Sequence, residues 1–183
     1  MAPILGEITM KVLAFAASNS STSINRKLVN YAANQIDAAD VDLLDLNDYE
    51  MPLYSSDREG VTGIPQLAHD FRRKISDADL VMISFAEHNG SYTAAYKNLF
   101  DWTSRIDAKV FQGKRMLLLA TSPGRAGAKN VLAAAQNSMP HFGGEVLGTL
   151  SVPSFYENFD AETGELRDAE LSGALVGLLE CVV

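Results

Sequence analysis

The sequence predicts a three-layer α/β/α protein built on a doubly wound sheet of five parallel strands in the order 2-1-3-4-5. Short β-rich runs alternate with longer segments whose apolar residues recur at helical spacing. The strand-like runs are continuously apolar, which indicates burial on both faces, as in a parallel sheet between two helix layers. The chain has 183 residues, 47% of them hydrophobic, which suits one domain with one substantial core.

Each element is identified by its own pattern. Strands are short continuous apolar runs, such as Leu-Val-Met-Ile-Ser-Phe at 80–85. Helices show apolar residues three or four positions apart, as at Leu67, Phe71 and Ile75. In chain order we expect a strand at 11–17, a helix at 24–36, a strand at 41–46, a turn-rich connection at 47–64, a helix at 67–78, a strand at 80–85, a helix at 95–106, a strand at 116–120, a helix at 131–142, a strand at 146–151 and a closing helix at 171–182.

The ends of the domain and the location of the protein are expectations from simple signals. Met10 opens a Met-Lys-Val-Leu-Ala-Phe run that resembles a natural start, so we expect one domain at 10–183 and an extension or leader at 1–9. No apolar run approaches the roughly 20 residues of a membrane span. The first residues also lack the layout of an export signal, which favours the cytoplasm and no membrane partner.

Charge and composition narrow the function further. The formal net charge is −8, which disfavours nucleic acid as a partner. Carboxylates crowd the segments 37–59 and 157–180, as a solvated face or as a docking surface for a basic protein. The single cysteine, Cys181, is expected to be a small packed or terminal residue. The three histidines lack metal-ligand spacing, so no metal site is expected.

In a doubly wound sheet, ligands bind beyond the carboxyl ends of the strands, so the loops 17–25, 86–92 and 121–127 should carry the chemistry. The first loop reads Ala-Ser-Asn-Ser-Ser-Thr-Ser-Ile-Asn and lacks the glycines of a nucleotide fingerprint. It places hydroxyls and amides at a helix N-terminus, which suits a phosphate monoester. Ser18, Ser20, Ser23 and Asn25 are its candidate side-chain donors, and the alternative is an ordinary helix cap.

The other two loops offer backbone rather than side chains. Asn89-Gly90 permits an unusual turn that points amides outward, as a flat heteroaromatic ring with carbonyl and imine edges requires. Gly124 and Gly127 allow close approach of the backbone to a ligand, and Arg125 adds one cation. A plain strand-to-helix turn is the alternative for both loops.

These loops resemble those of the NADPH-dependent FMN reductase family, which includes flavin, quinone, chromate and azo-dye reductases. The family's first loop runs approximately Gly-Ser-x-Arg-x-x-Ser-x-Asn, and its third-strand loop Pro-Glu-Tyr-Asn-Gly-Ser followed by Leu-Lys-Asn-x-x-Asp-Trp. Its fourth loop resembles Ser-Pro-Gly-x-x-Gly. The matching positions here are Ser18, Ser23, Asn25, Glu87, Asn89, Gly90, Ser91, Lys97, Asn98, Asp101, Trp102, Ser122, Pro123, Gly124 and Gly127.

The resemblance implies a flavodoxin-like fold and an FMN site. The phosphate would lie at the first loop, the ring at 87–92, with the Gly90 or Ser91 amide near flavin N5, and 122–127 would close the other side. The implied cofactor-binding residues are Ser18, Ser20, Ser23, Ile24, Asn25, Glu87, His88, Asn89, Gly90, Ser91, Tyr92, Ser122, Pro123, Gly124 and Gly127.

Four positions depart from the family pattern. Ala17 replaces a glycine, and Ala86 and His88 replace the Pro and Tyr beside the ring. Ser20 replaces the phosphate-binding arginine, so either FMN binds more weakly or Arg26 or a partner subunit supplies the charge.

The implied activity is an FMN-dependent NAD(P)H oxidoreductase that works by a ping-pong hydride relay to a small acceptor, such as free flavin or a quinone. NADPH or NADH would be the donor, and Arg125 and Arg105 are candidates for the 2′-phosphate. No catalytic side chain is required. A homodimer or homotetramer is implied, with the helix 93–105 and its Trp102 at the interface. The alternatives are a flavodoxin-type one-electron carrier and a scaffold that has lost its flavin.

Overall fold

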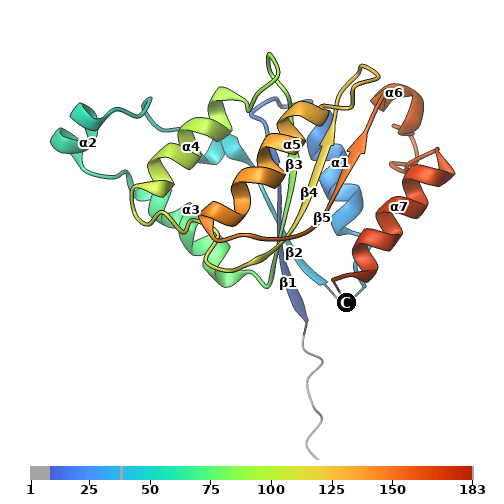
Figure 1. Cartoon of the computed structure of the whole chain (residues 1–183), viewed down its shortest axis with the longest axis horizontal. Coiled ribbons are helices and arrows are strands. Elements are labelled where there is room, and N and C mark those ends of the chain that lie inside the picture. The colour runs from blue at the N-terminus through green and yellow to red at the C-terminus, as the bar shows by residue number, and fades with distance from the viewer. Residues whose placement is uncertain (1–8, 38, 183) are drawn as a thin grey trace, which may run out of the picture.

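The computed structural model describes residues 9–37 and 39–182. Its five strands form one parallel sheet in the order β2-β1-β3-β4-β5, with helices on both faces (Figure 1), so the predicted fold class is confirmed. The strands are β1 (Met10–Ala17), β2 (Ala39–Leu44), β3 (Leu80–Phe85), β4 (Arg115–Thr121) and β5 (Glu145–Val152). The expected N-terminal extension at 1–9 lies outside the described residues except for its last position.

Helices cover both faces of the sheet. They are α1 (Ile24–Ala33), the 3-10 helix η1 (Leu46–Tyr49), α2 (Ser56–Thr62), α3 (Gln66–Asp77), α4 (Ala94–Ser104), α5 (Lys129–Ser138), the 3-10 helix η2 (Met139–Phe142), α6 (Phe155–Asn158) and α7 (Ala169–Glu180). Helices α3, α4 and α5 pack on one face, and α1, α6 and α7 pack on the other. No helix among the described residues is long and apolar enough to cross a membrane.

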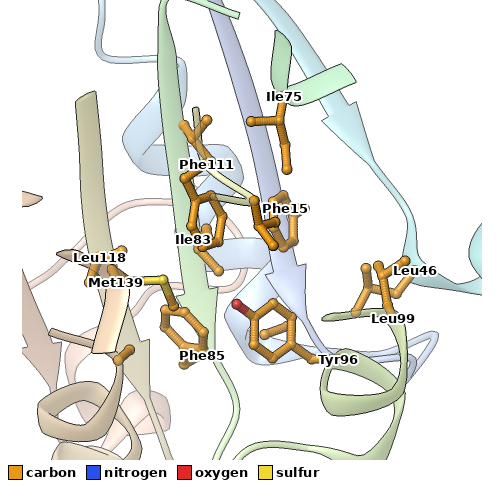
Figure 2. Packing of buried hydrophobic residues seen from close by; sticks show 14 of the residues in the cluster. Phe15, Leu46, Ile75, Ile83, Phe85, Tyr96, Leu99, Phe111, Leu118 and Met139 are labelled. Carbon is orange, nitrogen blue, oxygen red and sulfur yellow. The ribbon is translucent and has the colours of Figure 1, made fainter. Parts of the chain in front are cut away.

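The two hydrophobic cores follow from the two-residue period of the strands. Leu13 and Phe15 of β1 point into the core under α3, α4 and α5, while Val12 and Ala14 point into the core under α1 and α7. Figure 2 shows the first core, where Phe15 lies between Ile75 of α3 and Tyr96 of α4. Continuous apolar strands are therefore needed here, because each face of the sheet must be buried.

The structure departs from the expected elements in places where the pattern is weak. Strand β2 begins two residues earlier than predicted and alternates between exposed and partly buried residues, because it is an edge strand. The predicted connection 47–64 contains η1 and the seven-residue α2, none of whose residues is buried. The helix predicted at 131–142 divides into α5 and η2, because Pro140 has no N–H to continue α5.

The sheet order brings three loops to one edge. The last residues of β1, β3 and β4 are neighbours, since Ala17 pairs with Phe85 and Phe85 pairs with Ala120. The loops that follow these strands meet at the upper edge of the sheet in Figure 1. The chain therefore presents a candidate site where the topology of the fold predicts one.

Candidate cofactor-binding site

A cleft of about 280 Å³ lies at this edge of the sheet. It is lined by the β1–α1 loop, the first turn of α1, the start of the β3–α4 loop, the end of β4 with the start of the β4–α5 loop, and α6. The lining residues are Ser18, Ser20, Thr22, Ser23, Ile24, Asn25, Ala86, Glu87, His88, Thr121, Ser122, Pro123 and Tyr156. The structure thus brings nine of the fifteen predicted site residues into one cleft, whereas Asn89, Gly90, Ser91, Tyr92, Gly124 and Gly127 lie further along the β3–α4 and β4–α5 loops.

Volume alone does not single out this cleft. A hollow of about 340 Å³ lies at the opposite edge, against Lys11 and Asp42 near the amino ends of β1 and β2, where the Lys74 Nζ pairs with the Asp42 carboxylate at 2.6 Å. Another, of about 430 Å³, lies between α1 and the 159–165 segment. The 280 Å³ cleft differs from these two because it lies at the carboxyl ends of β1, β3 and β4 and includes N–H groups that no acceptor among the described residues receives.

The hydroxyls of the β1–α1 loop accept hydrogen bonds from the backbone of the same loop. The Ser18 Oγ accepts from the Ser20 N–H at 3.2 Å, and the Ser20 Oγ accepts from the Thr22 N–H at 3.3 Å. The Ser23 Oγ caps α1 by accepting from the Arg26 N–H at 3.2 Å. Because a hydroxyl can accept and donate at once, these bonds hold the loop and leave the hydroxyl hydrogens of Ser18 and Ser23 able to donate to an anion.

The first turn of α1 adds backbone donors. Among the described residues, no protein acceptor receives the N–H of Ile24 or of Asn25. These two groups sit at the positive end of the helix dipole, which favours an anion. The loop therefore meets the requirements for a phosphate with neutral donors.

The Asn25 side chain has a further task. It is only 2% exposed, and its Oδ1 accepts from the Thr121 N–H at 3.0 Å and from the Ser84 Oγ at 2.7 Å. Its Nδ2 donates to the Thr121 carbonyl at 3.1 Å. The side chain thus joins the start of α1 to the ends of β3 and β4. One amide hydrogen and the backbone N–H are what it has left for a ligand.

None of the described arginines lines this cleft. The Arg26 guanidinium pairs with Asp45, which follows β2, at 2.5 Å. The Asn47 backbone N–H holds the pKa of Asp45 below its ordinary value, with help from the Asn47 side chain and Arg26 against the opposing effect of desolvation. Arg26, which the sequence offers as a replacement for the phosphate-binding arginine, is therefore paired with Asp45 beside β2. No Lys or Arg is among the described residues that line the cleft.

The β3–α4 turn has the backbone shape that the Asn-Gly pair predicts. His88 and Ser91 exchange two backbone hydrogen bonds, of 3.0 and 3.1 Å. Between them, Asn89 and Gly90 have φ values of 53° and 77°, so both lie in the left-handed region. A Cβ at Gly90 would meet no atom within 4 Å, so glycine is needed here for its conformation and not for space inside the chain.

Glu87 fixes this turn to α5. Its Oε2 accepts from the Asn130 N–H at 3.0 Å and from the Val131 N–H at 2.9 Å. The residue before α5, Ala128, has no side-chain acceptor, so Glu87 caps the helix from another loop. The carboxylate is therefore committed to α5, and it holds the turn in place.

Tyr92 faces α5 and not the cleft. Its hydroxyl shares a 3.1 Å hydrogen bond with the Ser138 Oγ, and its ring lies 5.3 Å from that of Tyr96 and 5.7 Å from that of Phe85. Burial raises the pKa of Tyr92.

The β4–α5 loop is packed closely against the segment after β5. A Cβ at Gly127, where φ is 60°, would lie 2.3 Å from the Ser151 Oγ, so the backbones can approach only because residue 127 is glycine. The carbonyls of Gly124 and Ser122 accept from the N–H groups of Ser154 and Phe155 at 3.0 and 3.1 Å. These bonds fix α6 beside the cleft.

Tyr156 of α6 lines the cleft and was not predicted from the sequence. The signal that could have found it is positional, since it follows the fifth strand at the edge where ligands bind. Within the described residues, no group of three His, Cys, Asp or Glu side chains is placed to hold a metal ion.

The sheet order and the loops at its carboxyl edge define a protein of the flavodoxin-like class. The sequence profile of the NADPH-dependent FMN reductase family matches residues 10–157, so the chain belongs to that family and is an oxidoreductase. The chain is 27% identical over 178 residues to the NADH-dependent flavin reductase subunit 2 of Lactobacillus johnsonii, covering 91% of each protein.

A further relative agrees with this family, and a solved structure agrees with the fold. The chain is 29% identical over 140 residues to a quinone reductase of Escherichia coli K12, covering 71% of this chain and 70% of that protein. Among solved structures, the flavoenzyme NAD(P)H:(acceptor) oxidoreductase FerB from Paracoccus denitrificans has the same fold, with a TM-score of 0.72 and 24% identity over 94% of this chain and 97% of that one.

Proposed function

We propose that this protein is an FMN-dependent NAD(P)H oxidoreductase that passes reducing equivalents to a small acceptor, such as free flavin or a quinone. The observation that carries the proposal is that two kinds of hydrogen-bond donor, hydroxyl groups and backbone N–H groups still able to donate to a ligand, lie together at one edge of the sheet. The β1–α1 loop offers hydroxyl hydrogens and the N–H groups of Ile24 and Asn25, and the β3–α4 turn offers backbone amides at positive φ. Family membership and the relatives' names support the same activity.

The donor set fits FMN at both of its ends. Ser18, Ser23 and the first turn of α1 would hold the phosphate, with Ser20 and Asn25 beside them. In the β3–α4 turn, the Ser91 N–H already donates to the His88 carbonyl, whereas no protein acceptor among the described residues receives the Gly90 N–H. We therefore assign the Gly90 amide, rather than that of Ser91, to the ring edge.

The protein's own part in the reaction is to bind and orient. When bound, FMN supplies hydride transfer between a nicotinamide and the acceptor, in a ping-pong order. Glu87 holds the ring-binding turn through α5, and Asn25 holds the phosphate-binding turn to β3 and β4. His88 lines the cleft beside Ala86 and is the side chain we place nearest to an incoming substrate. No side-chain acid, base or nucleophile is needed for this sequence of steps.

Of the two arginines considered, one remains near the site as a candidate for setting the preference between NADPH and NADH. Arg125 is exposed in the β4–α5 loop. Arg105 caps the far end of α4, which is about 17 Å long, and its Nε bonds Glu59 of α2 at 3.0 Å. We propose Arg125 as the contact for a 2′-phosphate. A lower NADPH-to-NADH preference in Arg125→Ala, with Arg105→Ala unchanged, would support this assignment.

We also propose a single domain over 10–183 that assembles as a homodimer or homotetramer. Support comes from a groove of about 240 Å³ between α4 and η2, lined by Phe100, Met139 and Phe142. Trp102 is not part of that surface, because it is fully buried and its Nε1 donates to the Pro52 carbonyl at 2.7 Å. Sedimentation of the purified chain would measure the assembly, and a monomer at all concentrations would contradict it.

The function is tested by flavin titration followed by a steady-state assay. We expect saturating FMN to raise the thermal unfolding temperature, and the loaded protein to oxidise NAD(P)H rapidly with a quinone or free flavin as acceptor. An unchanged unfolding temperature would remove the cofactor from the proposal. FMN binding with reduction only by a separate reductase would favour the one-electron carrier, which the net charge of −8 would suit.

A further inference from the structure

In the proposed site, the cleft binds a phosphate dianion without a cationic side chain among the described residues that line it. The described residues that line it include no Lys or Arg, and the Arg26 guanidinium is paired with Asp45. In the absence of positive charge, each additional neutral donor contributes a larger share of the binding. A donor from a segment outside the β1–α1 loop would therefore matter.

Helix α6 is held firmly at the side of this cleft. Phe155 is 1% exposed, and its ring stacks on that of Phe159 at 4.7 Å. Phe159 in turn packs edge-on against Tyr31 of α1 at 5.9 Å. Together with the two backbone bonds from the β4–α5 loop, these contacts hold α6 at the side of the cleft.

Tyr156 is the aromatic residue of α6 that this packing leaves exposed. It is 68% exposed, its ring lies edge-on to Phe155 at 5.6 Å, and it lines the cleft with Ser18, Ser20 and Ser23. No partner for its hydroxyl is found among the described residues. A phenol on a helix that is held in place, with an O–H that no acceptor among the described residues receives, is suited to donate to an anion.

We propose that the Tyr156 hydroxyl donates a hydrogen bond to the phosphate of the cofactor. This bond takes over part of the role of the phosphate-binding arginine of the family pattern, which Ser20 replaces in this chain. This inference rests on the proposed FMN site, and it adds a phosphate contact from α6. It makes Tyr156 a determinant of the preference for FMN over riboflavin, which has the same ring and no phosphate.

The test compares FMN and riboflavin affinities in the full-length chain freed of flavin by dialysis. Tyr156→Phe removes only the hydroxyl. Tyr31→Phe is the matched control, because Tyr31 packs in the same aromatic group but lines a different hollow. We expect Tyr156→Phe to weaken FMN binding about tenfold and to leave riboflavin binding unchanged, whereas Tyr31→Phe should change the ratio of the two affinities little.

Each other outcome overturns the inference. Unchanged FMN affinity in Tyr156→Phe, or an equal loss for both flavins, would show that the hydroxyl does not contact the phosphate. If the unmodified chain prefers FMN and the variant keeps that preference, only the role of Tyr156 fails. If the unmodified chain binds neither flavin, the proposed FMN site fails with it.

Discussion

The β1–α1 loop and the β3–α4 turn present donors in different ways. The first loop uses side chains, because Ser18 and Ser23 accept a backbone bond and keep a hydrogen to donate. The second uses backbone, because Asn89 and Gly90 take positive φ and no protein acceptor among the described residues receives the Gly90 N–H. Next to each lies one polar residue, Asn25 in the first turn of α1 or Glu87 before the turn, whose side chain holds the segment in place.

The comparison shows that a polar residue in a binding loop has one of two tasks. Asn25 and Glu87 look like ligand contacts by residue type, yet their side chains are occupied by protein partners. Comparing the affinities for riboflavin and FMN in solution distinguishes the roles of the two loops. Loss of a phosphate donor should weaken FMN alone, whereas loss of the ring-binding turn should weaken both flavins.

The largest effect is expected at the clamp of the first loop. Asn25→Ala removes the partners of the buried Thr121 N–H and carbonyl and of Ser84, so the free energy of unfolding should fall by roughly 3 kcal/mol. Urea denaturation measures this, with the exposed Asn19→Ala as the control, for which a change within about 0.5 kcal/mol is expected. A loss below about 1 kcal/mol for Asn25→Ala would contradict the clamp.

Gly90→Ala should come next. Its φ of 77° disfavours any side chain by about 1–2 kcal/mol, although the added Cβ meets no protein atom. We expect a folded protein that binds FMN and riboflavin about tenfold less well, as titration would show. Gly60→Ala, in α2 and equally open, is the matched control and should leave both affinities intact. Full flavin affinity in Gly90→Ala would move the ring away from this turn.

Glu87→Gln should destabilise the protein by about 1 kcal/mol, because a neutral amide interacts less well with the N-terminus of α5. Since Glu87 holds the turn that we propose binds the ring, we expect the affinities for FMN and riboflavin to fall by the same factor. A loss of affinity for FMN alone would place Glu87 at the phosphate end of the cofactor. The two loops would then not have separate phosphate and ring roles. Glu157→Gln, on an exposed residue of α6, serves as the control.

Ser23→Ala should weaken FMN by about 1 kcal/mol, from one lost phosphate donor, and leave riboflavin unaffected. Stability should fall by a similar amount, because the cap of α1 is lost as well. Ser55→Ala removes the cap of α2, away from the cleft, and separates the capping effect from the binding effect. Equal weakening of both flavins would argue against a phosphate at this residue.

The smallest effect concerns acid stability beside the first loop. The pKa of Asp45 is held below its ordinary value of 3.8 in the folded protein, chiefly by the Asn47 backbone N–H. Asp45 therefore stabilises the fold above pH 3.8 and loses this contribution as the pH falls through its lower folded pKa. Asp45→Asn should reduce the loss of unfolding free energy at pH values below 3.8. The change should be less than about 1 kcal/mol, since the ion pair of Asp45 with Arg26 is partly exposed. An unchanged slope would exclude Asp45 as a contributor.

Sequence patterns are sufficient for the fold where burial is complete. The continuous apolar runs of β1, β3 and β4 predict a parallel sheet, and the order of that sheet locates the loops. The edge strand β2 and the short α2 and α6 escaped prediction in detail, because few or none of their residues are buried in a regular pattern.

The candidate site divides in a similar way. The hydroxyls of the first loop and the Asn-Gly turn are visible in the sequence, since residue type alone limits what they can do. The partners of Asn25 are 59 and 96 residues away in the chain, so no local pattern shows that its side chain is occupied. Tyr156 likewise reaches the cleft only through the packing of Phe155 and Phe159.

Cys181 follows α7 and is exposed, near the C-terminal end marked in Figure 1, at the edge of the sheet opposite the cleft. As the chain contains one cysteine, a maleimide dye would attach at a single known place. Its emission could then follow refolding or subunit exchange while the flavin itself reports ligand binding, so two optical signals from one sample would track opposite ends of the molecule.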